Sequence, residues 1–117
     1  LRPRLRVLHG DEIALGPGKV ELLAAIRSAG TLAEAARALG LSYMRAWKLV
    51  RTMNACFREP LVVAERGGRL GGGARLTATG EAVLALYRTM ERSAEAAMEP
   101  AWRELRRHLR TGAAPKR

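Results

Sequence analysis

Two short helical segments separated by a very short turn limit the fold of this chain more than any other feature. The stretch TLAEAARALG carries Thr31 and Glu34 in the T-x-x-E spacing of a capping box, in which each side chain satisfies a free backbone N–H at a helix start. Gly40 ends this helix, and Ser42 begins another one that extends to about residue 57. Two helices joined by a short turn containing glycine are typical of a helix-turn-helix motif.

The second of these helices has two chemically different faces. At 100° per residue, one face is apolar and comprises Ala46, Val50, Met53 and Phe57, with Trp47 and Leu49 at its borders. The opposite face is mostly basic and polar, as in a recognition helix that lies in a DNA major groove. An ordinary solvated basic face is the alternative. The DNA-binding residues predicted in the two helices are Thr31, Ser42, Tyr43, Arg45, Lys48, Arg51 and Thr52, and Met44 lies on the same face.

A glycine- and arginine-rich stretch, ERGGRLGGGARLT, connects two strand-like segments at residues 61–65 and 74–77. Glycine admits positive φ and lets the backbone approach a phosphate closely. Arg66, Arg69 and Arg75 would supply charge for the DNA backbone or an adjacent minor groove. The hairpin is therefore predicted to be a DNA-binding wing, with a flexible loop carrying incidental arginines as the alternative. The absence of the G-K-[ST] ending argues against a nucleotide-binding P-loop.

The other segments complete a mainly α fold with a small β wing. Two short strands are predicted at residues 4–8 and 12–16, and a helix at residues 18–29 that stops at Gly30. A long helix is predicted to begin after Thr77 and to kink or split near Glu99, because Pro100 lacks a backbone N–H. Its apolar residues recur at steps of three and four, which predicts a seam that pairs with the same helix in a homodimer. The predicted dimerisation residues are Val83, Tyr87, Met90, Ala94, Ala97 and Leu105.

The sequence thus predicts a winged helix-turn-helix domain over residues 1–76, a long dimerisation helix over residues 77–110 and a disordered basic tail over residues 111–117. With 21 Lys and Arg against 11 Asp and Glu, the net charge of +10 favours a polyanionic partner, here double-stranded DNA. We expect no bound cofactor, metal or catalytic activity, because the single Cys56 and two histidines form no ligand cluster and no nucleophile or paired-carboxylate motif occurs. Cys56, beside Phe57, is expected to be a buried thiol. The absence of a long apolar run or secretory segment favours the cytoplasm over a membrane.

Several motifs together resemble the N-terminal winged helix-turn-helix domain of ModE, the molybdate-responsive bacterial transcriptional regulators, which is related to LysR-type DNA-binding domains. They are the run GTLAEAARALGLSYMRAWKLVRTMN, the wing ERGGRLGGGARLTATGE and the long helix after it, spanning about residues 4–110. The resemblance implies a homodimer that binds a palindromic operator through the third helix and the wing. It also implies DNA contacts by Ser42 and Tyr43, and packing roles for Trp47 and the alanines. The matched positions are Thr31, Ala35, Ala36, Ser42, Tyr43, Ala46, Trp47 and Gly71 to Gly73.

ModE proteins also carry C-terminal oxyanion-binding domains, and this sequence stops where they would begin. A fragment and a single-domain relative both fit, and the effector, whether an oxyanion, a protein or none, stays open. An architectural protein that coats DNA through its charge is a second hypothesis. A winged domain that binds an acidic protein is a third.

Overall fold

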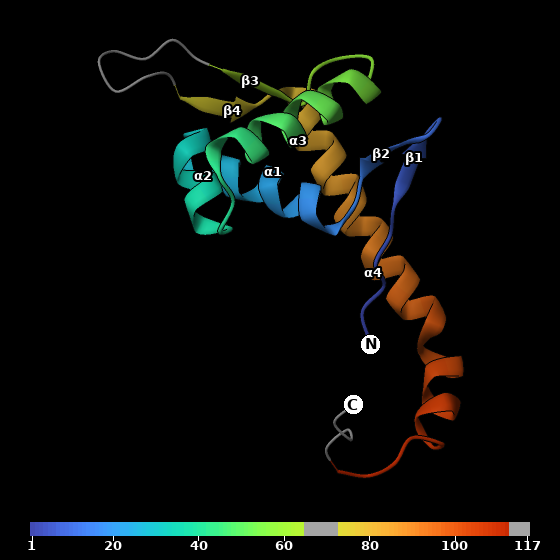
Figure 1. Ribbon diagram of the computed structural model, residues 1–117. Coiled ribbons are helices and arrows are strands. Elements are labelled where there is room, and N and C mark those ends of the chain that lie inside the picture. The colour runs from blue at the N-terminus through green and yellow to red at the C-terminus, as the bar shows by residue number, and fades with distance from the viewer. Residues whose placement is uncertain (65–72, 113–117) are drawn as a thin grey trace.

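The computed structural model describes residues 1–64 and 73–112, and its order of elements is that of a winged helix-turn-helix domain followed by a long helix (Figure 1). β1 (Val7–His9) and β2 (Glu12–Leu15) form an antiparallel hairpin, and β3 (Val62–Ala64) pairs with β4 (Ala74–Leu76) in a second one. The helices are α1 (Pro17–Ala29), α2 (Leu32–Ala38), α3 (Tyr43–Cys56) and α4 (Ala78–Arg106). The predicted fold class is therefore confirmed.

The helix boundaries follow from the residues at their ends. Pro17 stands in the first turn of α1, where its missing N–H costs no helical hydrogen bond. Gly30 ends α1 in the left-handed conformation, φ 78°, and its N–H donates to the carbonyl of Ile26 at 2.9 Å. The first strand is shorter than predicted, since residues 4–6 precede β1. These local signals placed α1 within one residue of its predicted range.

Side-chain caps start both helices of the helix-turn-helix motif. The hydroxyl oxygen of Thr31 accepts a hydrogen bond from the N–H of Glu34 at 3.1 Å, and that of Ser42 accepts one from the N–H of Arg45, also at 3.1 Å. The carboxylate of Glu34 instead accepts from Arg37 at 2.7 Å. Of the two hydrogen bonds of the predicted capping box, the described structure therefore contains the one donated by Glu34.

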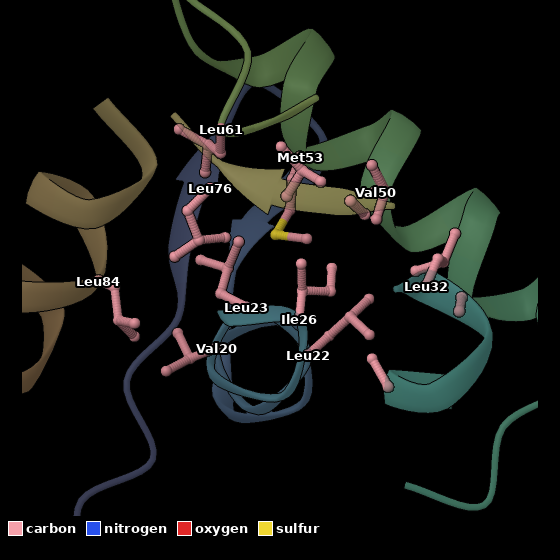
Figure 2. Packing of buried hydrophobic residues seen from close by; sticks show 14 of the residues in the cluster. Val20, Leu22, Leu23, Ile26, Leu32, Val50, Met53, Leu61, Leu76 and Leu84 are labelled. Atoms are coloured by element: carbon pink, nitrogen blue, oxygen red, sulfur yellow. The ribbon is translucent and has the colours of Figure 1, made fainter. Parts of the chain in front are cut away.

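The hydrophobic core surrounds α1 (Figure 2). Leu22, Leu23 and Ile26 are fully buried, and they face Val50 and Met53 of α3. Leu61, Leu76 and Leu84 close the core from the wing and from α4. Burial of this many aliphatic side chains, each contributing about 1.5–3 kcal/mol, holds α3 in a fixed position on the domain.

The wing and the start of α4 are tied together at Thr77. The hydroxyl of Thr77 donates to the carbonyl of Pro60 at 2.7 Å, its oxygen accepts from the N–H of Gly80 at 2.9 Å, and its N–H donates to the carbonyl of Leu61 at 2.9 Å. A Cβ added at Gly80 would lie 2.2 Å from the Leu61 oxygen. The close approach of the chain to α4 therefore requires glycine at position 80.

α4 projects from the domain, and its first turns belong to the core rather than to a free surface (Figure 1). Tyr87 is 1% exposed and its hydroxyl donates to the carbonyl of Leu5 at 2.7 Å, while Val83 packs against the core. Both residues were predicted to face a second protomer, but within the protomer Tyr87 bonds to the N-terminal segment and Val83 packs against the core. Met90 and Leu105, further along the helix, are exposed.

Pro100 does not split α4. The helix is continuous through Pro100 to Arg106, and its axis changes direction in its C-terminal part (Figure 1). Because Pro100 is exposed, water can solvate the carbonyl that lacks its helical partner. The predicted tail at residues 111–117 lies outside the described residues from position 113 onward.

Candidate nucleic-acid interface

The exposed face of α3 is basic, as the helical wheel predicted. Ala46, Val50 and Met53 are at most 2% exposed and point into the core. Arg45, Lys48 and Arg51 are exposed. At the N-terminal end of the same helix, the large side chains of Tyr43 and Met44 are also exposed, by 51% and 66%. One face of α3 thus offers guanidinium, ammonium, phenol and thioether groups to a partner.

Several residues at the borders of this face differ in burial from the prediction: Thr52 is less exposed than predicted, and Cys56 and Phe57 are less buried. Thr52 and Cys56 are half-buried, and so is Phe57, which packs at the edge of the core. Trp47 is 38% exposed, so the packing role implied for it holds for only part of its indole. The alanines with the same implied role, Ala35, Ala36 and Ala46, are buried.

The two capping hydroxyls lie at helix starts that face outward. Thr31 is half-buried and Ser42 is exposed. Each oxygen accepts a backbone hydrogen bond, and a hydroxyl that accepts one bond can still donate its proton to another group. Capping therefore leaves both residues able to donate to a phosphate.

The wing strands β3 and β4 pair in the register Val62↔Leu76, Val63↔Arg75 and Ala64↔Ala74, and β4 packs against α1 and α4. Arg75 is exposed on β4. Arg66, Arg69, Gly71 and Gly72 lie at positions 65–72, outside the described residues. The N–H of Ala74 donates to the carbonyl of Gly30 at 2.9 Å, so β4 is also attached to the end of α1.

Asn54 fixes the wing to α3, a role that was not predicted from the sequence. Its side-chain oxygen accepts from the N–H groups of Leu61 and Val62 at 2.8 and 3.2 Å, and its amide donates to the carbonyl of Val62 at 3.0 Å. The sequence signal that could have indicated this role is an amide side chain in the last turns of a helix, shortly before a strand. Asn54 thereby sets the distance between the wing and the basic face.

The β1–β2 hairpin also lies near α3, since β2 packs against this helix. An open groove of about 560 Å³ separates the hairpin from the C-terminal half of α3. It is lined by His9, Glu12, Lys48, Arg51, Thr52, Ala55 and Cys56. The basic face therefore has a β-hairpin on each side, although only the wing was predicted to belong to the interface.

In the part of the chain that the structure describes, no carboxylate forms an ion pair with a cation of α3. Elsewhere arginines are paired, as in Arg27–Glu81 at 3.0 Å and Arg88–Glu91 at 3.1 Å. Within residues 1–64 and 73–112, Arg45, Lys48 and Arg51 form no ion pair. Unpaired cations gathered on one surface attract a polyanion, because the attraction is not offset by nearby negative charge.

Two other kinds of site do not occur in the described ranges. No group of three or more His, Cys, Asp and Glu side chains there could hold a metal ion. No helix there is both long and apolar enough to cross a membrane.

A family model for bacterial regulatory helix-turn-helix proteins of the lysR family matches residues 18–81, more than half of the 117 residues. The chain belongs to this family. The lysR-family match extends from α1 through the helix-turn-helix motif and the wing to the first turn of α4. The β1–β2 hairpin and most of α4 lie outside it. The family is one of regulatory proteins and not of enzymes, in agreement with the prediction of no catalytic activity.

The resemblance to ModE is also confirmed. Molybdenum transport protein ModE of Azotobacter vinelandii is 42% identical over 86 residues, which cover 74% of this chain and 32% of that protein. Molybdenum-pterin-binding protein MopA of Rhodobacter capsulatus is 48% identical over 77 residues, covering 66% of this chain and 29% of that protein. The chain thus spans about a third of the length of these relatives. Among solved structures, the CbnR DBD–DNA complex matches with a TM-score of 0.57 and 25% identity, over 75% of this chain and 95% of that one.

Proposed function

We propose that the chain is a DNA-binding transcriptional regulator without catalytic activity, in which α3 enters the major groove of double-stranded DNA. Arg45, Lys48 and Arg51, which are exposed on α3 and form no ion pair with the described residues, carry this proposal. An α-helix fits the major groove of B-DNA, where arginine and lysine donate to guanine and to phosphates. The solved CbnR domain with the same fold is bound to DNA, and relatives of this chain are named transcriptional regulators.

Within this proposal the residues divide by their position on the interface. Tyr43, Arg45, Lys48 and Arg51 reach base edges or phosphates from α3, and Thr52 contributes from its border. Thr31 and Ser42 donate their hydroxyl protons to phosphates at two helix starts. Arg66, Arg69 and Arg75 of the wing contact the backbone or an adjacent minor groove. These roles are assigned by exposure for the described residues and by sequence for Arg66 and Arg69.

The regulator acts as a homodimer on a palindromic operator, with α4 as its dimerisation element. The exposed apolar residues of α4 beyond the core support this assignment: Met90 is 47% and Leu105 55% exposed. Ala94 and Ala97 lie between them at helical spacing. We assign the dimer contact to these four residues and not to Val83 or Tyr87, which are packed within the protomer. Two copies of α3 would enter major grooves one helical turn apart, about 34–36 Å.

We place the protein with its DNA, in the bacterial cytoplasm.

Single alanine variants on α3 test the proposal. Lys48→Ala and Arg51→Ala should each weaken binding to duplex DNA. Loss of one phosphate interaction should lower the log–log salt slope of binding by about 0.9 for each protomer bound. The matched control is Arg92→Ala, which changes an exposed arginine on α4. This variant should bind duplex DNA as tightly as the wild type. Wild-type protein that binds no duplex at low salt would contradict the proposal and favour an adaptor for an acidic protein. Equal binding to all duplexes would favour an architectural role.

A further inference from the structure

A second basic groove lies where the N-terminal arm, residues 1–6, meets the helix-turn-helix motif. Its volume is about 470 Å³. Arg4 and Arg6 of the arm, Lys19 of α1 and Arg45 of α3 contribute its cations, and Ile13 and Leu41 are among its apolar lining residues. We call it the arm groove. Arg45 belongs to both this groove and the exposed face of α3, so the two surfaces are continuous.

The arm is held in place by contacts that turn its arginines outward. Leu5 and Val7 pack against the core, and the carbonyl of Leu5 accepts the hydrogen bond from Tyr87 at 2.7 Å. Side chains alternate in an extended chain, and Arg4 and Arg6 are accordingly exposed. The two guanidinium groups therefore stand on an anchored segment, which reduces the entropy lost when they bind a ligand.

The charge of the arm groove is strongly positive. Four cationic side chains line it against one carboxylate, that of Glu21. In the described part of the chain none of the four forms an ion pair, and the Lys19 ammonium donates to the backbone carbonyl of Ile13. A backbone carbonyl leaves the positive charge of lysine in place. The groove is thus complementary to an anion that is long enough to meet several cations.

The arm groove and the wing lie on opposite sides of α3. Arg45 lines the groove, whereas Asn54 holds the wing, and nine residues correspond to about two and a half helical turns, or half a rotation. A duplex that receives α3 in its major groove has a sugar-phosphate backbone along each edge of that groove. In such a complex, strands β3 and β4 would lie toward one backbone and the arm groove toward the other.

We propose that the arm groove binds the DNA sugar-phosphate backbone on the side of α3 opposite the wing. This inference rests on the proposed DNA binding and adds a second contact region to it. Arg4 and Arg6 each bind a phosphate oxygen through the guanidinium fork, and Lys19 adds an ammonium charge. The arm precedes the residues matched by the lysR-family model, so this contact is an addition to the shared module.

The double variant Arg4→Ala/Arg6→Ala tests the inference. Its affinity for the best available duplex is measured by fluorescence anisotropy at several salt concentrations, with far-UV circular dichroism as a check of folding. We expect weaker binding, a log–log salt slope reduced by about two for each bound protomer, and unchanged sequence preference. Phosphate-ethylation interference should disappear at one flank of each half-site only. Arg4→Lys/Arg6→Lys, which retains both charges, should keep most of the slope.

Arg92→Ala/Arg106→Ala is the matched control, since it removes two exposed charges from α4. It should retain the wild-type slope. If the arm variant also kept the wild-type slope while Lys48→Ala lowered it, the arm-groove inference would be wrong and the proposed function would stand. A change in sequence preference at constant slope would assign the arm to bases and overturn the backbone contact. Wild-type protein without duplex affinity would remove the proposed function itself.

Discussion

Asn54 of α3 and Val62 of β3 exchange two hydrogen bonds: the Asn54 amide donates to the Val62 carbonyl at 3.0 Å, and its oxygen accepts from the Val62 N–H at 3.2 Å. The same oxygen accepts from the N–H of Leu61 at 2.8 Å. One side chain therefore replaces the strand partner that these backbone groups lack at the start of the wing. This residue joins the proposed recognition helix to the first strand of the wing.

Replacing Asn54 by Ala should lower the free energy of unfolding by about 1–3 kcal/mol, because half-buried backbone groups lose their partners. Urea denaturation measures this loss. Asn54→Asp keeps an accepting oxygen for the N–H groups of Leu61 and Val62 but places a second carboxylate oxygen against the Val62 carbonyl, so it should also destabilise the domain. Equal stability of the wild type and Asn54→Ala would mean that the wing is held by other contacts.

Gly80→Ala should destabilise the domain by about 1–3 kcal/mol or more, since the added Cβ would lie 2.2 Å from the backbone oxygen of Leu61. Gly18→Ala in α1 is the control, because nothing lies within 4 Å of its added Cβ. That change should be neutral or stabilising by up to about 1 kcal/mol. The midpoint of thermal unfolding should therefore fall for Gly80→Ala and stay the same or rise for Gly18→Ala. Equal midpoints for the two variants would contradict the close approach at Gly80.

Tyr87→Phe should cost about 0.5–1.5 kcal/mol at neutral pH, because the hydrogen bond to Leu5 is removed. Burial raises the pKa of Tyr87 above its ordinary value of 10.0, and the nearby Glu91 adds to this. The folded state then holds the phenol proton more tightly than the unfolded state. This difference in pKa contributes free energy of folding that is fully present below pH 10, the ordinary pKa of tyrosine. The contribution is lost as the pH rises through the pKa of the folded state.

Comparing the wild type with Tyr87→Phe isolates this titration from that of the lysines. The stability difference between them, followed by urea denaturation from pH 8 upward, should shrink above about pH 10. A difference that stays constant over this range would show that the Tyr87 phenol has the same pKa in both states.

Met90→Glu should weaken the proposed dimer by at least about tenfold, because a carboxylate would replace an apolar side chain that each protomer buries in the contact. Arg92→Glu is the control: it lies half a rotation away on α4 and is exposed. Sedimentation velocity over a range of micromolar concentrations measures both. A wild-type chain that stays monomeric there would remove α4 as a dimerisation element.

Local signals in the sequence were sufficient for most of the helices and for the basic face. The caps at Thr31, Ser42 and Thr77 act through bonds within three residues, so spacing alone places them. The apolar periodicity of α3 likewise separates Ala46, Val50 and Met53 from the exposed cations. Neither depends on a distant part of the chain.

Contacts between distant residues explain what the sequence could not place. Tyr87 matched the apolar spacing of a dimer seam. Its hydroxyl instead donates to the carbonyl of Leu5, 82 positions earlier, and its ring is buried in the core. Apolar periodicity identifies a buried face and does not say whether the same chain or a second copy covers it. The arm groove was missed for the same reason, since it joins Arg4, Lys19 and Arg45 from three elements.

Sequence-specific recognition by α3 is best tested by selecting bound duplexes from a random DNA pool with the purified chain and sequencing them. We predict enrichment of a palindrome whose half-sites lie about one helical turn apart. A selected site should bind more than about a thousandfold tighter than random duplex. Binding that weakens with salt but enriches no sequence would contradict specific recognition by α3 and assign the protein to charge-driven coating of DNA.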